Sequence, residues 1–236
     1  MATAMELALL ADAVYDSDPQ VKGWVRFGFQ PSGSGATNAF QGAAFRKGGD
    51  VAIAFKGTSG GRDVVADLKL ASGMNTYQYS SARKFVKEVK PDSGSKVILC
   101  GHSLGGATAQ IIGNRMRLPF VTFNAPGVGL ISRNVGEMAA TAATGSAALR
   151  TLGAIASAIW HPMQAARDAA ALFHVVSGVN FRLGKDIVGS TGVHYGKVIE
   201  IPYSGGALDL IAKHKMGSMI AALETSSYRN WQIGKL

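Results

Sequence analysis

The chain has 236 residues, of which 47% are hydrophobic and 17% are charged, so it can bury one sizeable core and is not intrinsically disordered. Its one cysteine, Cys100, excludes a disulfide framework and an all-cysteine metal site. The net charge is +9, and residues 45–117 contribute +7 of it, with 12 Lys and Arg against 5 Asp and Glu, which favours a polyanionic partner.

Apolar and polar residues alternate along the chain in patterns that predict strands interspersed with helices. In chain order we expect a helix at 4–16, strands at 24–29, 40–45 and 51–55, a helix at 80–90, a strand at 96–100, a helix at 103–116, a strand at 119–123, two Ala-rich helices within 137–173, strands at 173–181 and 197–201, and a helix at 207–224. This order predicts an α/β fold with a mostly parallel central sheet. The chain has neither an internal repeat nor a linker, so we expect a single domain over 1–236, with 137–173 as a helical insertion.

A G-x-S-x-G motif, Gly101-His102-Ser103-Leu104-Gly105, lies between the predicted strand 96–100 and the helix that follows it. In such a nucleophile elbow a sharp strand-to-helix turn exposes the serine oxygen at the edge of the sheet, and glycines avoid a clash with the neighbouring strand and helix. A second match, Gly57-Thr58-Ser59-Gly60-Gly61, ends in a flexible glycine turn that would hold a nucleophile poorly. Ser103 is therefore the candidate nucleophile.

The elbow segment VILCGHSLGGATA resembles that of the class 3 lipases, the fungal-type lipase branch of the α/β hydrolases. Five further segments resemble parts of that family in the same order: LALLADAVYD its first helix, VAIAFKGTSGGRDVVADL its oxyanion segment, VTFNAPGVG the strand and turn after the elbow helix, NFRLGKDIV its acid segment, and AKHKMGSMIAAL its histidine segment. The resemblance covers most of the chain except 137–173. It implies an α/β-hydrolase fold and a Ser-His-Asp triad.

The catalytic acid of an α/β hydrolase follows the nucleophile in the chain, and the histidine follows the acid. The carboxylates to consider are Glu137, Asp168, Asp186, Glu200 and Asp209. Asp186 follows a strand-like segment and matches the acid position of the family. The resemblance therefore favours Asp186 as the acid.

Two of the five histidines remain as candidates for the catalytic base. His161 lies in the insertion, His174 precedes the acid, and we expect His102, inside the elbow, to point away from Ser103. His214 begins the segment that resembles the family's histidine helix, so we favour it. His194, just before the strand predicted at 197–201, stays open as the alternative.

These roles predict an acyl-enzyme mechanism, in which His214 takes the proton of Ser103 and Asp186 orients the imidazole. We expect the backbone N–H groups of Leu104 and Thr58 to form the oxyanion hole. The Asp, Glu and His spacings show no metal-ligand pattern, and we expect neither a metal nor a cofactor.

The resemblance and the basic excess together predict a serine carboxylic-ester hydrolase that acts on lipids, with phospholipase A1-like activity. A soluble carboxylesterase or thioesterase and a non-catalytic lipid-binding member of the fold are the alternatives. Segments 59–70 and 137–173 are the candidates for a lid. We expect a phospholipid or other lipid ester as substrate, contact with a membrane surface through basic residues, and no nucleic acid.

Glu6 and Asp12 interrupt the first apolar stretch, and no positively charged region precedes it, so the chain shows no secretory signal pattern. We therefore expect synthesis in the cytoplasm, with any export by a non-Sec route. Small basic bacterial members of this family without a signal peptide are often delivered as toxic phospholipase effectors and kept in check by a cognate inhibitor. The resemblance therefore implies a bacterial effector with an inhibitory partner protein.

Overall fold

The computed structural model describes residues 1–31, 40–57, 76–89, 94–128, 177–184, 186–203 and 210–233. The elements, in chain order, are α1 (Ala4–Ala13), β1 (Val25–Gln30), β2 (Gly42–Lys47), β3 (Asp50–Phe55), α3 (Thr76–Glu88), β4 (Lys96–His102), α4 (Leu104–Met116), β5 (Phe120–Phe123), β6 (Gly178–Leu183), β7 (Lys197–Ile201), α8 (Leu210–His214) and α9 (Met216–Thr225). The expected insertion at 137–173 lies outside the described residues.

The seven strands form one sheet in the order of the chain, from β1 at one edge to β7 at the other. β1, β2 and β3 pair antiparallel, while all pairs from β3 to β7 are parallel. Parallel neighbours need a crossover connection, which α4 supplies between β4 and β5. The predicted α/β fold with a mostly parallel sheet is confirmed.

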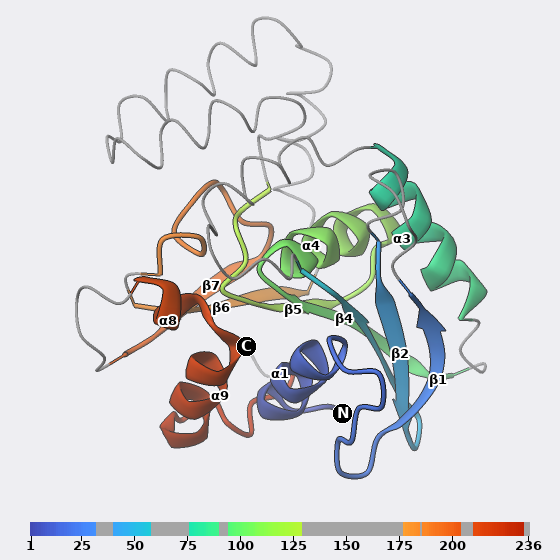
Figure 1. Ribbon diagram of the computed structural model, residues 1–236, viewed down its shortest axis with the longest axis horizontal. Coiled ribbons are helices and arrows are strands. Elements are labelled where there is room, and N and C mark those ends of the chain that lie inside the picture. The colour runs from blue at the N-terminus through green and yellow to red at the C-terminus, as the bar shows by residue number, and fades with distance from the viewer. Residues whose placement is uncertain are drawn as a thin grey trace, which may run out of the picture.

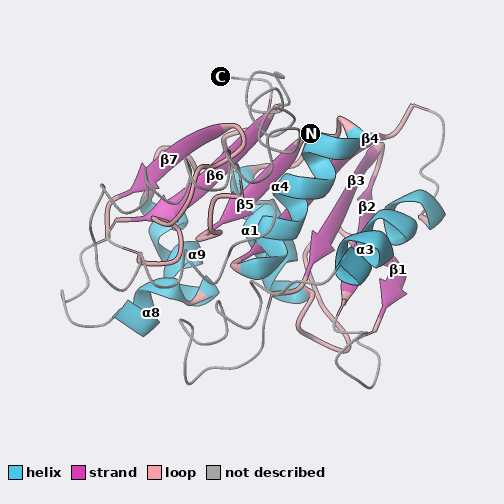
Figure 2. Ribbon diagram, turned by 90° about the horizontal axis from the view of Figure 1, so that it is seen from above, coloured by secondary structure: helices cyan, strands magenta, loops and turns pink. Residues whose placement is uncertain are grey.

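Helices cover both faces of the sheet, with α1 and α9 on one face and α3 and α4 on the other (Figures 1 and 2). Alternate residues of β3 show why: Ala52 and Ala54 face the core under α1, whereas Val51, Ile53 and Phe55 face the core under α4. Central strands that bury both faces read as continuous apolar runs, and this explains the sequence of β3.

The N-terminal helix α1 begins with a capping box. Thr3 accepts a hydrogen bond from the Glu6 backbone N–H at 3.2 Å, and the Glu6 carboxylate accepts one from the Thr3 N–H at 2.9 Å. Such caps stabilise a helix by about 0.5–2 kcal/mol. Within the described part of the chain, no helix is long and apolar enough to cross a membrane.

The C-terminal helix differs from the sequence prediction, because the single helix expected at 207–224 is divided into α8 and α9. Lys215 separates them with an extended backbone (φ −66°, ψ 143°). The break frees the last carbonyl groups of α8 from helical hydrogen bonds, and side chains at the ends of β4 and β5 donate to two of them, those of Lys213 and His214. The turn therefore fixes the place of His214.

Candidate active site

The elbow at Ser103 is a tight turn from β4 into α4. Ser103 has φ 54° and ψ −125°, a conformation that strains a residue with a side chain by about 1–3 kcal/mol. A Cβ on Gly101 would lie 2.4 Å from the Gly105 carbonyl carbon, and one on Gly105 would lie 2.0 Å from the Phe55 oxygen. Only glycine fits at these two positions, so the motif is needed for helix α4 to pack against β3 and β4.

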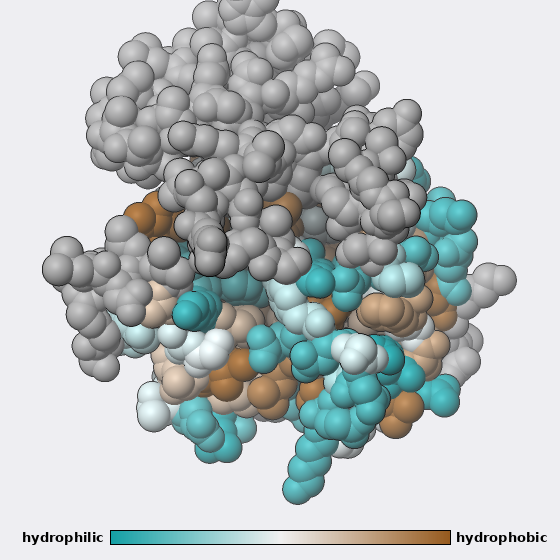
Figure 3. Space-filling model, viewed as in Figure 1, coloured by the Kyte–Doolittle hydropathy of each residue, from teal (hydrophilic) through white to brown (hydrophobic). Residues whose placement is uncertain are grey.

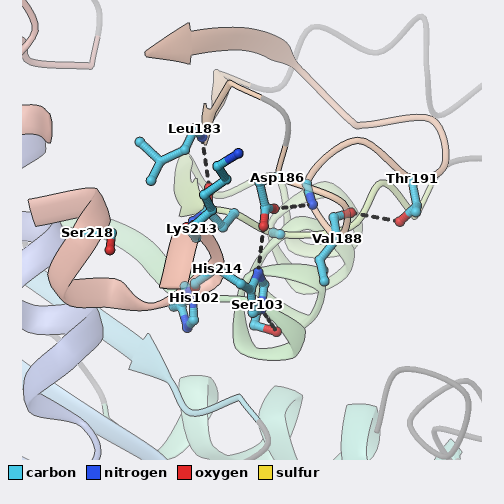
Figure 4. A network of polar contacts seen from close by, with 12 residues as sticks. His102, Ser103, Leu183, Asp186, Val188, Thr191, Lys213, His214 and Ser218 are labelled. Atoms are coloured by element: carbon cyan, nitrogen blue, oxygen red, sulfur yellow. Dashed lines mark hydrogen bonds and ion pairs between the residues drawn. The ribbon is translucent and has the colours of Figure 1, made fainter. Parts of the chain in front are cut away.

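Ser103, His214 and Asp186 form one chain of hydrogen bonds (Figure 4). The Ser103 Oγ lies 2.8 Å from Nε2 of His214, and Nδ1 of His214 lies 3.1 Å from Oδ1 of Asp186. Because a carboxylate only accepts, Nδ1 carries the proton and Nε2 is left to accept the hydroxyl proton of Ser103. All three side chains are buried. The structure thus brings together the three residues that the sequence analysis selected.

Asp186 is held by the turn that follows β6. Its second carboxylate oxygen, Oδ2, accepts the Gly189 backbone N–H at 2.5 Å, and its own N–H donates to the Leu183 carbonyl at 3.0 Å. Both oxygens of this completely buried carboxylate therefore have hydrogen-bond partners. A buried carboxylate needs such partners to remain charged, and here they also fix the direction in which Oδ1 points.

The expected oxyanion donor Leu104 is the first residue of α4, where a backbone N–H has no partner within the helix. The end of β3 lies beside it, since a Cβ on Gly57 would be 3.4 Å from the Leu104 nitrogen. The second expected donor, Thr58, lies outside the described residues. The described part of the site therefore places one donor and the residue that directly precedes the other.

Tyr15, at the end of α1, fixes Gly57 and was not singled out from the sequence. Its hydroxyl oxygen accepts the Gly57 N–H at 2.9 Å, and burial raises the pKa of Tyr15 to about 12, so the phenol stays protonated at neutral pH. The Lys56 ammonium lies 5.3 Å from the centre of the Tyr15 ring. The segment LADAVYD resembles the family's first helix, which is the signal that could have pointed to this tyrosine.

Asn124 is a second residue that sequence reasoning missed. It follows β5 with φ 46° and is completely buried. Its Nδ2 donates to the Lys213 carbonyl at 3.0 Å, and its Oδ1 accepts the Leu183 N–H at 2.9 Å. Asn124 thus joins the strand that precedes Asp186 to the helix that ends in His214. A polar residue between the buried strand and Pro126 was the available signal.

His194, the alternative base, forms a different contact. Its Nε2 lies 2.9 Å from the carbonyl oxygen of Ala125, so this nitrogen carries a proton and donates it. Burial lowers the pKa of His194, with a smaller contribution of the same sign from Arg182. His194 supports the loop after β5, and the described geometry gives it no hydrogen bond to Ser103.

The other carboxylates and histidines considered from the sequence do not join this network within the described residues. Glu200 on β7 forms an ion pair with Arg182 at 2.9 Å. Glu137, Asp168, Asp209, His161 and His174 lie outside the described residues, as do the lid candidates 59–70 and 137–173. In the described ranges no group of three or more His, Cys, Asp and Glu side chains could hold a metal ion.

Comparison with known protein families shows the family of the chain. A family model of the Tle-like phospholipase domain, described as phospholipase-like, matches residues 6–201. The chain belongs to this family. The matched range includes Ser103 and Asp186 and ends before His214, so the place of His214 depends on the hydrogen bonds described above.

An extracellular phospholipase A1 of Serratia liquefaciens is 33% identical to this Tle-like phospholipase domain over 132 residues. The aligned part is 52% of this chain and 41% of the Serratia protein, so the chain spans less than half the length of that relative. Among solved structures, the Lip2 lipase of Yarrowia lipolytica is similar with a TM-score of 0.50 and 12% identity, over 84% of this chain and 77% of that one. This second likeness shows the fold alone, that of the lipases among the α/β hydrolases.

Proposed function

We propose that the protein is a serine carboxylic-ester hydrolase that acts on phospholipids in the manner of a phospholipase A1. The observation that carries the proposal is the hydrogen-bonded chain from Ser103 through His214 to Asp186. Membership of the Tle-like phospholipase family and the likeness to a Serratia phospholipase A1 support the substrate class.

The geometry supports a two-step reaction. His214 Nε2, 2.8 Å from the Ser103 Oγ, takes the hydroxyl proton as the serine oxygen attacks the carbonyl carbon of the ester. The same proton then passes to the leaving alcohol, and an acyl group remains on Ser103. Water, deprotonated by His214, releases the fatty acid and restores the serine. Asp186 stabilises the imidazolium that forms in each step.

The negative charge that develops on the carbonyl oxygen needs donors in place before the reaction. The N–H of Leu104 and the N-terminus of the 13-residue helix α4 lie next to Ser103 and supply one donor and a partial positive charge. We assign the second donor to Thr58, which follows the anchored Gly57. Loss of one such donor slows the reaction by about 10²- to 10³-fold.

Membrane contact through basic residues is part of the proposal. In the backbone register Lys47 lies opposite Asp50, and Asp50 opposite Lys96, at the ends of β2, β3 and β4 that lie away from Ser103. Arg115 and Arg117, at the end of α4, are exposed at the same end of the sheet. A 13-residue helix is about 20 Å long, so these charges act at a distance from the serine.

We therefore propose that the end of the sheet with Lys47, Lys96, Arg115 and Arg117, called here the basic end, attracts the protein to anionic lipid and leaves the Ser103 end free to receive the ester. On the face seen in Figure 3, the described residues show hydrophilic and hydrophobic side chains interspersed, so this face offers mixed contacts rather than one apolar surface. Exposed charges of this kind act over a Debye length of about 8 Å at physiological salt, and their effect falls as salt rises.

The experiment measures fatty-acid release from vesicles of zwitterionic and anionic phospholipid, from a triglyceride emulsion and from a soluble short-chain ester, with Ser103→Ala as the matched variant. We expect release from the vesicles that the variant loses by at least about 10⁴-fold. Turnover of the soluble ester alone would replace the proposal with a carboxylesterase. Absence of serine-dependent turnover on all substrates would leave a lipid-binding protein.

The products from the same vesicles show which of the two ester bonds of the phospholipid is cleaved. A phospholipid with different fatty acids at its two positions should release the sn-1 chain and leave a 2-acyl lysophospholipid. Release of the sn-2 chain would contradict the A1 assignment while leaving the serine mechanism intact.

A further inference from the structure

His102 is a buried titratable residue that the mechanism above does not use. It is the last residue of β4 and directly precedes Ser103. Its Nε2 lies 2.6 Å from the carbonyl oxygen of His214, and the centres of the two imidazole rings are 4.8 Å apart. Both residues are labelled in Figure 4. From the sequence we expect the His102 side chain to point away from Ser103, and no sequence pattern indicates its contact with His214.

The hydrogen bond from His102 satisfies a carbonyl group that the turn between α8 and α9 leaves without a partner inside the helix. His214 ends α8, and the extended backbone of Lys215 removes its carbonyl from the helical pattern. A buried carbonyl left without a donor is unfavourable, and the Nε2–H of His102 supplies one. The donor comes from the residue bonded to Ser103, so one short segment carries the nucleophile and also holds the backbone of His214.

We propose that His102 is a positioning residue for catalysis. It fixes the backbone and ring of His214 so that Nε2 stays 2.8 Å from the Ser103 Oγ and Nδ1 stays 3.1 Å from Asp186. This inference rests on the proposed serine mechanism. A displacement of about 1 Å in such a pair can slow a reaction about 10²-fold, so the hydrogen bond acts on the rate and not only on the fold.

A protonated His102 would still donate a hydrogen bond from Nε2 to the His214 carbonyl. It would also place a cation beside the imidazolium that forms on His214. Burial and the nearby His214 ring lower the pKa of His102 to about 3, so it stays neutral under ordinary conditions. A neutral donor suits the position, since it holds the carbonyl without opposing the positive charge that the mechanism requires on His214.

The test compares His102→Gln, whose amide N–H₂ reaches to about the position of Nε2, with His102→Leu, which fills similar space without a donor. Ser218→Ala is the matched control, because the Ser218 hydroxyl donates to the Ala212 carbonyl at 2.7 Å in the same α8–α9 turn without bonding to His214. The measurements are kcat and KM on a soluble short-chain ester, the rate at which a fluorophosphonate modifies Ser103, and the melting temperature.

We expect His102→Leu to lower kcat and the fluorophosphonate rate by about 10²-fold, with KM within about threefold of the parent. His102→Gln should recover at least tenfold of that loss, and Ser218→Ala should stay within about threefold of the parent. Should His102→Leu fail to fold, His102→Asn replaces it, since its donor is too short to reach the carbonyl.

Three results would overturn the inference: full kcat in His102→Leu, equal kcat losses in the Leu and Gln variants, or a loss in Ser218→Ala that matches the loss of His102→Leu. A parent protein that reacts with the fluorophosphonate but releases no fatty acid from phospholipid would overturn the phospholipase assignment alone. A parent that reacts with neither ester nor fluorophosphonate would overturn the serine mechanism and this inference together.

Discussion

The two ends of the sheet are built from different interactions. At the carboxyl ends of β4 and β5, polar side chains are buried and paired, as in the bonds of Asn124 to Lys213 and of His214 to Asp186. At the opposite end, Lys96 and Arg115 are exposed to solvent. Buried hydrogen bonds depend on geometry and exposed charges depend on salt, so under the proposed function the first end performs the catalysis and the second attracts the protein to anionic lipid. We therefore expect mutations to disturb the two ends separately.

After the loss of Ser103 itself, the largest effect is expected from a pair of isosteric changes, one at each end. Asp186→Asn keeps the shape of the side chain but removes the charge that stabilises the His214 imidazolium, so kcat on a soluble ester should fall about 10³- to 10⁴-fold. Asp50→Asn, which weakens the ion pair with the N-terminal amine at the opposite end, should leave kcat within about twofold. A similar loss in both variants would show that the ends are not separable.

The next-largest effect is expected from a substitution in the nucleophile elbow. In Gly105→Ala the new Cβ would meet the Phe55 backbone oxygen at 2.0 Å, which forces α4 away from β3 and moves the Leu104 donor. We expect a loss of about 3 kcal/mol in the free energy of unfolding, with loss of activity in the molecules that fold. Urea unfolding and ester turnover measure the two effects.

Gly217→Ala is the control for this change, since a Cβ on Gly217 in helix α9 has no atom within 4 Å. It should keep full activity and stabilise the protein by up to about 1 kcal/mol, because alanine favours helix more than glycine does. An active and stable Gly105→Ala protein would contradict the geometry of the elbow.

Features that depend on local sequence could be predicted, whereas features that depend on distant contacts could not. The elbow depends on five consecutive residues and on the strand and helix beside them, so Ser103 was selected over Ser59 from the sequence alone. The position of His214 depends on Asn124, whose side-chain amide donates to the Lys213 carbonyl at the end of α8. These two residues are 89 positions apart in the chain. A pattern of local propensities contains no record of such a bond, and only the family resemblance favoured His214 over His194.

The same reason explains the missed break at Lys215. Apolar residues continue from 207 to 224 with helical spacing, so the sequence predicts one helix. The structure interrupts it where side chains of His102 and Asn124 donate to the last carbonyls of α8. Tertiary hydrogen bonds override the local propensity at the one turn that positions the candidate base.

A smaller effect is expected at the edge of the active site, from Tyr15→Phe. The change keeps the ring beside Lys56 but removes the oxygen that accepts the Gly57 N–H at 2.9 Å. The end of β3 then loses its anchor next to Leu104, and we expect kcat to fall about tenfold with KM nearly constant, because the oxyanion donors act only in the transition state.

Tyr228→Phe is the matched control for the loss of a hydroxyl group, since Tyr228 packs edge-on against Phe181 with ring centroids 5.8 Å apart. It should keep kcat within about twofold. Equal losses in the two variants would show that Tyr15 stabilises the fold without placing the end of β3.

The smallest effect is expected at the basic end. Lys96→Gln, Arg115→Gln and Arg117→Asn together remove three charges, and Asn suits position 117 because the backbone there is left-handed, with φ 56°. Turnover of anionic vesicles at low salt should fall a few-fold, the difference should vanish near 0.5 M salt, where the Debye length is only about 4 Å, and turnover of the soluble ester should not change. A loss on the soluble ester would connect the two ends, whereas unchanged vesicle turnover at low salt would remove the basic end from membrane attraction. Because the same triple variant is measured on both substrates, each of these results identifies which end of the sheet has been assigned the wrong role.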